Sequence, residues 1–192
     1  FRMWYLCFTP RYNDDYSERL KKDGRIAYAV SRNGLDWKRP QLGIHSYEGS
    51  TNNNIVIPCP WGVASVHFDP RDTDPQRRYK AQVRYHGHRA YFSADGIHWQ
   101  ELNNNQPVVR VSDRSMFWWD PNKRVFAGSA KRSHNGKRAQ AYAWSRDMLH
   151  WTVTSDWVHV ADERDHPGDE AEAAYGFPYG SQWIGFAEMR RV

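Results

Sequence analysis

The chain has 192 residues, which is enough for one domain with a substantial core. Its mean hydropathy of −0.90 is low, but 10 Trp, 11 Tyr and 8 Phe exclude a disordered chain, because disordered segments are poor in aromatic residues. The net charge of +5 comes from Lys and Arg spread along the sequence, which excludes a basic nucleic-acid-binding tail, and no apolar run is long enough to span a membrane.

Two further features of the composition leave alternatives open. We attribute the basic charge to solvated outer strands, with an anionic substrate such as a uronate or sulfated sugar as the alternative. Cys7 and Cys59 could pair or remain as thiols, and their number does not decide between an oxidising and a reducing compartment.

The first part of the chain predicts short strands joined by polar loops. Strands are expected at Phe1–Phe8 and Arg25–Ser31, with a short outer strand at Leu35–Arg39. Residues 9–24 are polar and charged and predict a long hairpin loop, with room for a helical turn near Ser17–Lys22.

The second part repeats this order. Ile55–Ile57 and Val63–Phe68 are strand-like, and Arg78–Tyr85 alternates with a period of two, with Tyr79, Ala81 and Val83 on one face. In the third part the expected strands are Val108–Val111, Met116–Trp119, Arg124–Lys131 and Arg138–Ser145. The last part begins at Trp157–Val160 and ends in a hairpin of 173–179 and 183–189 about Gly180.

One seven-residue pattern occurs three times. The copies are Ser31-Arg-Asn-Gly-Leu-Asp-Trp37, Ser93-Ala-Asp-Gly-Ile-His-Trp99 and Ser145-Arg-Asp-Met-Leu-His-Trp151. Each follows a strand-like run, and the tryptophans are 62 and 52 residues apart. A strand-rich repeat of roughly 40–60 residues is typical of propeller blades. The sequence therefore predicts an all-β β-propeller, with a β-sandwich as the main alternative.

Within a single partial propeller domain we expect a partial blade at 1–40, complete blades at 52–102 and 107–154, and a partial blade at 157–192. The chain starts within one strand-like run and stops just after another, so we expect a fragment of about three to four blades. Open sheet edges would then favour association, and the fragment alone would be inactive.

Five segments besides the blade turn carry a resemblance that covers nearly the whole chain: Phe1-Arg-Met-Trp-Tyr5, Asn52-Asn-Asn-Ile55, Gln76-Arg-Arg-Tyr-Lys80, Tyr175-Gly-Phe-Pro-Tyr179 and Trp183-Ile-Gly-Phe186. With the blade turn they resemble the five-bladed propellers of glycosyl hydrolase families 32 and 43, which include invertases, fructanases and arabinanases, and in particular a bacterial family 32-like group. It implies a glycosidase acting on furanosides or related oligosaccharides, with a secreted or periplasmic location favoured.

The sequence departs from the invertase-type pattern at its catalytic motifs. The Asn-Asp-Pro-Asn-Gly nucleophile motif, the Arg-Asp-Pro motif and the Glu-Cys acid/base motif do not occur in it. The strand that carries the nucleophile in that family would precede Phe1. The blade turn also resembles the sialidase Asp-box, but with one residue fewer between Asp and Gly, so a sialidase-like propeller is a further alternative.

Glycoside hydrolysis needs two carboxyl groups, one protonated and one ionised. Inner strands converge at a propeller axis, so the polar residues that precede them are the candidates. Asp113 would stabilise the transition state, with a surface ion pair as the structural alternative. Glu170 or Glu172 would be the acid/base, and Asp169 is the next candidate for that role. Six acids lie between Asp162 and Glu172, and we expect their repulsion to raise the pKa of any buried member. A solvated loop or a calcium-like site is the alternative.

The predicted sugar-binding residues are polar or aromatic side chains near the same strand ends: Asn53, Asn54, Arg114, Trp118 and Tyr175. Asn52 and Trp119 are neighbouring candidates, and the alternative for the asparagines is a turn. Trp183 is also a candidate for stacking, whereas the repeated Trp37, Trp99 and Trp151 are assigned to packing.

We expect no cofactor and no metal, because the histidines, including His86 and His88, do not match a zinc spacing. The expected partner is an oligosaccharide or polysaccharide. The alternatives to a glycosidase are a non-catalytic carbohydrate-binding propeller and a scaffold for protein contacts. The oligomeric state is left open.

Overall fold

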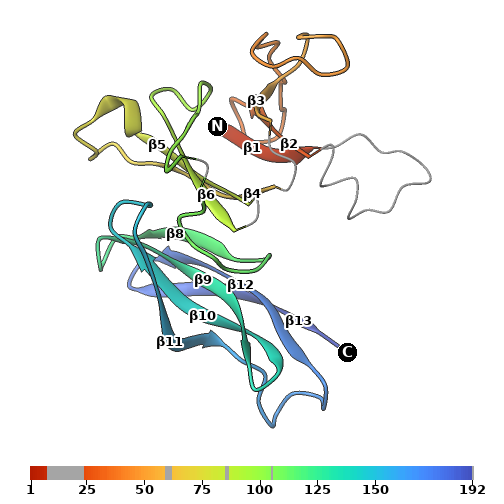
Figure 1. Cartoon of the computed structure of the whole chain (residues 1–192), viewed down its shortest axis with the longest axis vertical. Coiled ribbons are helices and arrows are strands. Elements are labelled where there is room, and N and C mark those ends of the chain that lie inside the picture. The colour runs from red at the N-terminus through yellow and green to blue at the C-terminus, as the bar shows by residue number, and fades with distance from the viewer. Residues whose placement is uncertain (8–23, 59–61, 85–86, 105, 192) are drawn as a thin grey trace. The chain divides into compact units, whose positions relative to one another are not determined.

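A computed structural model describes residues 1–7, 24–58, 62–84, 87–104 and 106–191 (Figure 1). Most of the predicted loop at 9–24, including the helical turn near Ser17–Lys22, and Cys59 lie outside the described residues. The fold is all-β, as expected. The one helix in the described ranges is the 3-10 turn η1 (Pro75–Arg77), so none of the described helices is long and apolar enough to cross a membrane.

The chain divides into two compact units. The first comprises residues 1–85 and 91–102, and the second comprises 86–90 and 103–192. The described strands form four antiparallel sheets, and β6 (His88–Ser93) of the β4–β7 sheet begins in the second unit and ends in the first.

The first unit contains a three-stranded and a four-stranded sheet. The three-stranded sheet has the order β1 (Arg2–Cys7), β2 (Arg25–Val30), β3 (Ile55–Ile57). The other runs in chain order through β4 (Val63–Phe68), β5 (Tyr79–Arg84), β6 (His88–Ser93) and β7 (Gln100–Glu101). We expected Ile55–Ile57 to open the second repeat, whereas β3 pairs with β2, with Ile57 opposite Ile26. All three residues of β3 are buried, so this short apolar strand completes the first sheet.

Both sheets of the first unit contribute to its core. The core consists of buried side chains from β2, β3 and β5: Ile26, Tyr28, Val56, Ile57, Ala81 and Val83. Trp4 packs against it, with its ring 5.4 Å from that of Tyr28 and 6.4 Å from that of Trp99. The predicted packing role of Trp99 is consistent with this contact.

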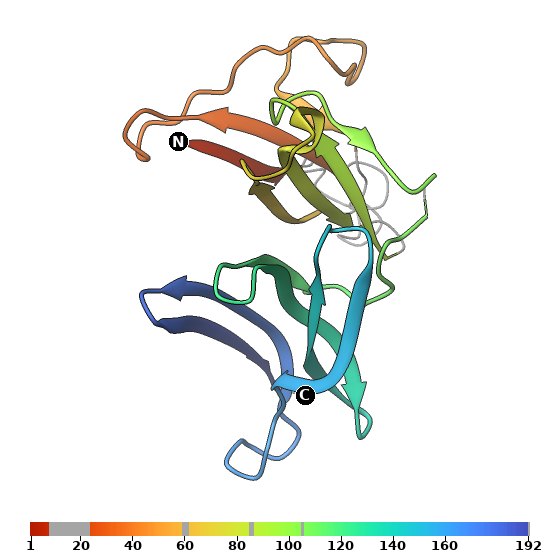
Figure 2. The ribbon, with the colours of Figure 1, turned by 90° about the vertical axis from the view of Figure 1, so that its left-hand side faces the viewer.

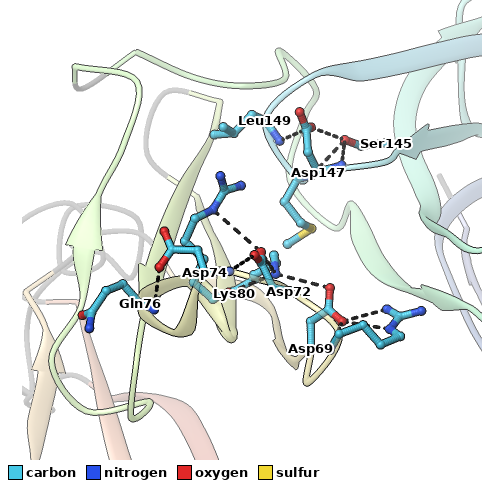
Figure 3. Close-up of polar contacts among 11 residues, drawn as sticks. Asp69, Asp72, Asp74, Gln76, Lys80, Ser145, Asp147 and Leu149 are labelled. Atoms are coloured by element: carbon cyan, nitrogen blue, oxygen red, sulfur yellow. Dashed lines mark hydrogen bonds and ion pairs between the residues drawn. The ribbon is translucent and has the colours of Figure 1, made fainter.

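A buried ammonium group holds the loop between β4 and β5. Lys80 on β5 is 2% exposed, and its Nζ lies 2.7 Å from Asp72 Oδ2 and 3.3 Å from Asp69 Oδ2 (Figure 3). It also donates to the carbonyl oxygen of Arg77 at 2.9 Å. Burial alone would raise the pKa of Asp69, but the charge of Lys80 and hydrogen bonds from Lys80 and Arg71 hold that pKa below its ordinary value.

The second unit contains a four-stranded sheet and a two-stranded sheet. The first has the chain-order arrangement β8 (Met116–Asp120), β9 (Val125–His134), β10 (Lys137–Ser145), β11 (Trp151–His159). The second is the hairpin β12 (Glu170–Tyr179) and β13 (Gln182–Arg190). The hairpin matches the prediction, but Trp157–His159, expected to open the last repeat, belongs to β11.

Two other predicted strands are reduced to single bridges. Leu35–Arg39 contributes one bridge from Lys38 to Val30, and Val108–Val111 contributes one from Val109 to His88. Isolated bridges give fewer ladder hydrogen bonds than full strands, so these stretches are connecting segments.

β12 lies against one face of the β8–β11 sheet (Figures 1 and 2). Polar side chains of the sheet hold its backbone: Ser129 Oγ donates to Ala174 O at 2.6 Å, and Gln140 Nε2 donates to Glu172 O at 2.8 Å. A register irregularity between Ala171 and Ala173 leaves Glu172 without a partner on β13, as in a β-bulge.

The three copies of the repeated pattern form the same turn. In each, the Ser hydroxyl oxygen accepts hydrogen bonds from the amides two and three residues on, as in Ser31 with Asn33 and Gly34. The Asn or Asp oxygen Oδ1 accepts two more amides, as Asp147 does from Leu149 (Figure 3). Each Trp Nε1 then donates to a turn carbonyl at 3.0 Å. These bonds explain why the pattern recurs.

Candidate functional site

The predicted carboxylates of the second unit meet at one ammonium group. Lys131 on β9 has a side chain that is only 7% exposed, and its Nζ donates to Asp113 Oδ1 at 2.7 Å and to Glu172 Oε1 at 2.6 Å. Asp113 comes from the loop before β8, and Glu172 comes from β12. Two residues far apart in the sequence, both proposed to act on a sugar, therefore contact the same cation.

A second cation joins the other predicted acid to this group. Arg138 on β10 is ion-paired with Glu170, and its Nε lies 3.2 Å from Glu172 Oε2. Glu170 and Glu172 thus face the same side of β12, as their spacing of two predicts. Lys131, Arg138, Asp113, Glu170 and Glu172 are called the ion cluster below.

The ion cluster favours the ionised form of Glu170. The expectation that crowded acids raise each other's pKa is not met at Glu170, whose pKa is lowered because the Arg138 guanidinium donates to it. A general acid needs the opposite shift. In this arrangement Glu170 is an anion at neutral pH and is a poor proton donor.

Two further acids of the 162–172 segment, Asp162 and Asp169, are also paired with basic side chains. Asp162 contacts Arg164, whose hydrogen bonds lower the pKa of Asp162 to about 2, and Asp169 Oδ1 lies 3.3 Å from Arg191 Nε. Among the described residues, no three His, Cys, Asp or Glu side chains gather as a metal ion would require. Asp162, Asp169, Glu170 and Glu172 thus contact arginines rather than converging on a common point.

The loop that presents Asp113 and Arg114 is fixed to β9. Ser115 Oγ donates to Ser112 O at 3.0 Å and accepts from the amide of Lys131 at 2.9 Å. Arg114 has a φ of +58°, in the left-handed region that residues other than glycine rarely adopt. Its guanidinium reaches the hydroxyl of Tyr175 and lies 3.5 Å from Glu188 Oε2. The hydrogen bond to Tyr175 raises the pKa of Arg114, so its charge is permanent.

An aromatic hollow of about 560 Å³ lies between the β8–β11 sheet and the β12–β13 hairpin. Its lining includes two of the predicted binding residues, Trp118 and Tyr175, together with Trp183. The rings of Trp118 and Trp183 are 5.9 Å apart and inclined by 49°. Gly176 lies beneath both indoles, since a Cβ added there would be 3.6 Å from Trp118 and 3.7 Å from Trp183. The volume falls in the range of ligand-binding pockets.

The hollow also contains a polar group that the sequence did not single out. Tyr142 lines the hollow, and its hydroxyl is buried and makes no hydrogen bond within the described part of the chain. Lys123 Nζ lies 4.7 Å from the centre of the Tyr142 ring.

The ion cluster and the aromatic hollow share one face of the β8–β11 sheet. Trp118 pairs with Ala127, and side chains alternate along β9, so Ala127, Ser129 and Lys131 point to the same side. Tyr175 on β12 links the two regions, because it lines the hollow and contacts Arg114. The resulting surface is charged at one end and aromatic at the other.

The predicted binding residues of the first unit have other hydrogen-bond partners. Asn53 Nδ2 donates to His45 O at 2.8 Å, and Asn53 Oδ1 accepts the amide of Ile55. Asn54 Nδ2 donates to Tyr5 Oη at 2.9 Å and to Tyr28 O at 2.7 Å. These amides close the loop before β3, which matches the alternative of a turn more closely than sugar binding.

Sequence reasoning missed Lys131, Arg138 and Tyr142. A signal for the two cations was present, since Lys131 ends one predicted alanine-containing strand and Arg138 begins the next. Charged residues are almost never buried without a partner, so a lysine in a strand that becomes buried indicates an ion pair. Tyr142 carried no signal that separated it from an ordinary core tyrosine.

Comparison with known proteins gives a fold but no family. No family model and no curated protein matches the chain. A solved structure of a BT0996 RGII complex is similar over 97% of this chain, with a TM-score of 0.56 and 16% sequence identity. This chain spans 61% of the length of the matched protein in that structure. At this identity the similarity supports the β-rich fold alone.

Proposed function

We propose that the chain binds a saccharide on the face formed by the aromatic hollow and the ion cluster. The observation that carries the proposal is the hollow itself, which places Trp118, Tyr175 and Trp183 around a space of about 560 Å³. Aromatic faces pack against the apolar face of a sugar ring, while charged groups and hydroxyls bind its hydroxyl groups. The carbohydrate-related neighbour, the BT0996 RGII complex, supports the same ligand class.

We further propose that the four sheets are blades of a β-propeller of the family 32/43 type. The chain-order arrangement of two four-stranded antiparallel sheets and the three equivalent turns support this architecture. A longer chain containing this sequence would test it, because additional blades of the same topology are required for closure.

Binding is tested by blocking the hollow. Gly176→Leu would place a side chain between Trp118 and Trp183, and Trp183→Ala would remove one stacking face. We expect each change to weaken binding of RGII, measured by calorimetry and affinity electrophoresis, by about tenfold or more. Trp37→Ala is the matched control, since Trp37 is 37% exposed and lies in the first unit. Unchanged binding in both hollow variants would overturn the proposal.

Hydrolysis is the second candidate function. It is favoured by the meeting of Asp113 and Glu172 at Lys131, because two nearby carboxyl groups are the minimum for glycoside cleavage. The ionised state of Glu170 favours binding instead. If the site is catalytic, Asp113→Asn or Glu172→Gln will abolish release of reducing sugar from RGII or furanoside substrates while binding persists. If the wild-type chain binds the saccharide but releases no reducing sugar, the result supports binding without catalysis.

A further inference from the structure

We infer that the bound saccharide is acidic and that Arg114 binds its anionic group, a carboxylate or a sulfate. This inference rests on the proposed saccharide binding and specifies the ligand class. It concerns the rim between the aromatic hollow and the ion cluster.

Arg114 has hydrogen-bonding capacity to spare. A guanidinium carries five N–H donors in a planar fork that matches an oxyanion in bidentate geometry. Among the described residues its side chain contacts the hydroxyl of Tyr175 and, at 3.5 Å, the carboxylate of Glu188. The Arg114 side chain is 51% exposed and that of Glu188 is 42% exposed, so solvent and ligand reach both.

The two cations of the ion cluster are already neutralised. Lys131 is bound by Asp113 and Glu172, and Arg138 by Glu170 and Glu172. Three carboxylates against two cations leave this group with a surplus of negative charge. An anionic group at the charged end of this face would therefore meet Arg114, whereas the ion cluster favours hydroxyl groups. Lys123, which lines the hollow, lies over the Tyr142 ring.

The position of Arg114 is fixed by its backbone. Its φ of +58° is unfavourable for a residue with a side chain, and such strain persists only where the surroundings impose it. Here the hydrogen bonds of Ser115 to Ser112 and Lys131 impose it. Tyr175, which the guanidinium contacts, also lines the hollow. A sugar ring in the hollow would present a charged substituent to Arg114.

Glu188 occupies the place that a ligand oxyanion would take. Its ion pair with Arg114 is long and solvent-exposed, and such pairs contribute little free energy. A ligand carboxylate or sulfate in bidentate contact would replace it. Glu188 then acts as an internal competitor, and its removal is expected to strengthen binding of an anion.

The test compares acidic and neutral probes by calorimetry on the whole chain. The probes are trigalacturonate, its fully methyl-esterified form, and a sulfated trisaccharide. We expect trigalacturonate to bind about tenfold more tightly than its ester. Arg114→Gln should remove this preference, and Arg114→Lys should retain part of it. Glu188→Gln should raise the affinity for trigalacturonate several-fold and leave the ester unaffected. If the sulfated trisaccharide binds as tightly as trigalacturonate and Arg114→Gln weakens both, Arg114 recognises a sulfate as well as a carboxylate.

The outcomes separate the two proposals. Binding of neutral and acidic probes with equal affinity, unaffected by Arg114→Gln but weakened by Gly176→Leu, overturns the acidic ligand and keeps saccharide binding. Failure of every saccharide, RGII included, overturns both. Thermal unfolding of each variant checks that loss of binding is not loss of folding, and Arg114→Gly, which suits the positive φ, serves as a variant without backbone strain.

Discussion

Lys131 Nζ lies 2.6 Å from Glu172 Oε1, although the two residues are 41 positions apart in the sequence. This ion pair joins the β8–β11 sheet to β12 and fixes the charged end of the candidate site. The same ammonium group holds Asp113, so three segments of the second unit depend on one side chain.

Removal of the Lys131 ammonium is expected to destabilise the fold. Lys131→Met leaves Glu172, which is 13% exposed, next to Asp113 without their shared cation. Breaking a buried pair by deleting one partner costs about 3 kcal/mol, less here because Asp113 is partly exposed. Urea unfolding measures the loss. Lys137→Met, an exposed lysine on the same hairpin, is the control and should change the free energy of unfolding by less than about 0.5 kcal/mol.

Lys80 is expected to be still more sensitive. Its side chain is 2% exposed and balances Asp69 and Asp72 in the loop before β5. Lys80→Met should reduce the free energy of unfolding by about 3–5 kcal/mol, because Asp69 and Asp72 lose their shared buried cation and keep only the more exposed Arg71 and Arg77. Lys38→Met at an exposed position is the comparison. A loss at Lys80 no larger than at Lys38 would show that the buried ammonium is not a structural element.

The turn glycines are expected to differ in their tolerance of a methyl group. Gly34 and Gly96 occupy equivalent positions with φ of +79° and +81°. A Cβ at Gly34 would lie 3.7 Å from Phe1, whereas at Gly96 it would lie 2.8 Å from Trp4 and 3.1 Å from Tyr79. Gly34→Ala should cost about 1 kcal/mol for the left-handed backbone, and Gly96→Ala about 2 kcal/mol more. Similar melting temperatures for the two variants would contradict the packing seen around Trp4.

Asp147 is expected to give the turn a dependence on pH. Burial would raise its pKa, but hydrogen bonds from the amides of Leu149 and His150, the His150 ring and Ser145 outweigh burial and lower the pKa to about 2. Because the pKa is lower in the folded state, the carboxylate stabilises the fold above about pH 4, and this contribution is lost as the pH falls toward 2.

Asp147→Asn isolates this contribution. Asn33 takes the same role in the first copy, so the amide oxygen can accept the turn hydrogen bonds. The variant should be less stable by under about 1 kcal/mol at pH 7, since the carboxylate is partly exposed, and the difference should vanish near pH 2. Unfolding measured from pH 2 to 7 gives the comparison. If the difference in the free energy of unfolding between the two proteins is constant from pH 2 to 7, the charge of Asp147 is not its cause.

The sequence predicted local features with most success. Period-two alternation located β5, and runs of small and aromatic residues located β2 and β10. The turn pattern predicted three equivalent turns because all of its hydrogen bonds form within seven residues. The all-β class followed from the absence of helical periodicity.

Long-range pairing could not be predicted in the same way. Ile55–Ile57 is equally apolar whether it pairs with β2 or with a later strand, and only the folded register selects β2. An assumed arrangement of strands predicted that Asp113 and Glu172 lie close together. It did not predict that Lys131 lies between them. Ion pairing depends on which cations face the acids, and a count of acids in one segment does not contain that information.

Met148 occupies the position that glycine holds in the other two turns, with a φ of +69°. The turn is thus defined by the Ser hydroxyl, the Asx oxygen and the Trp indole, and glycine only lowers its strain. A motif search that requires glycine would overlook one copy in this chain, whereas Ser-x-Asx-x-x-x-Trp retrieves all three. Repeat counts in distant relatives should be made with the latter pattern.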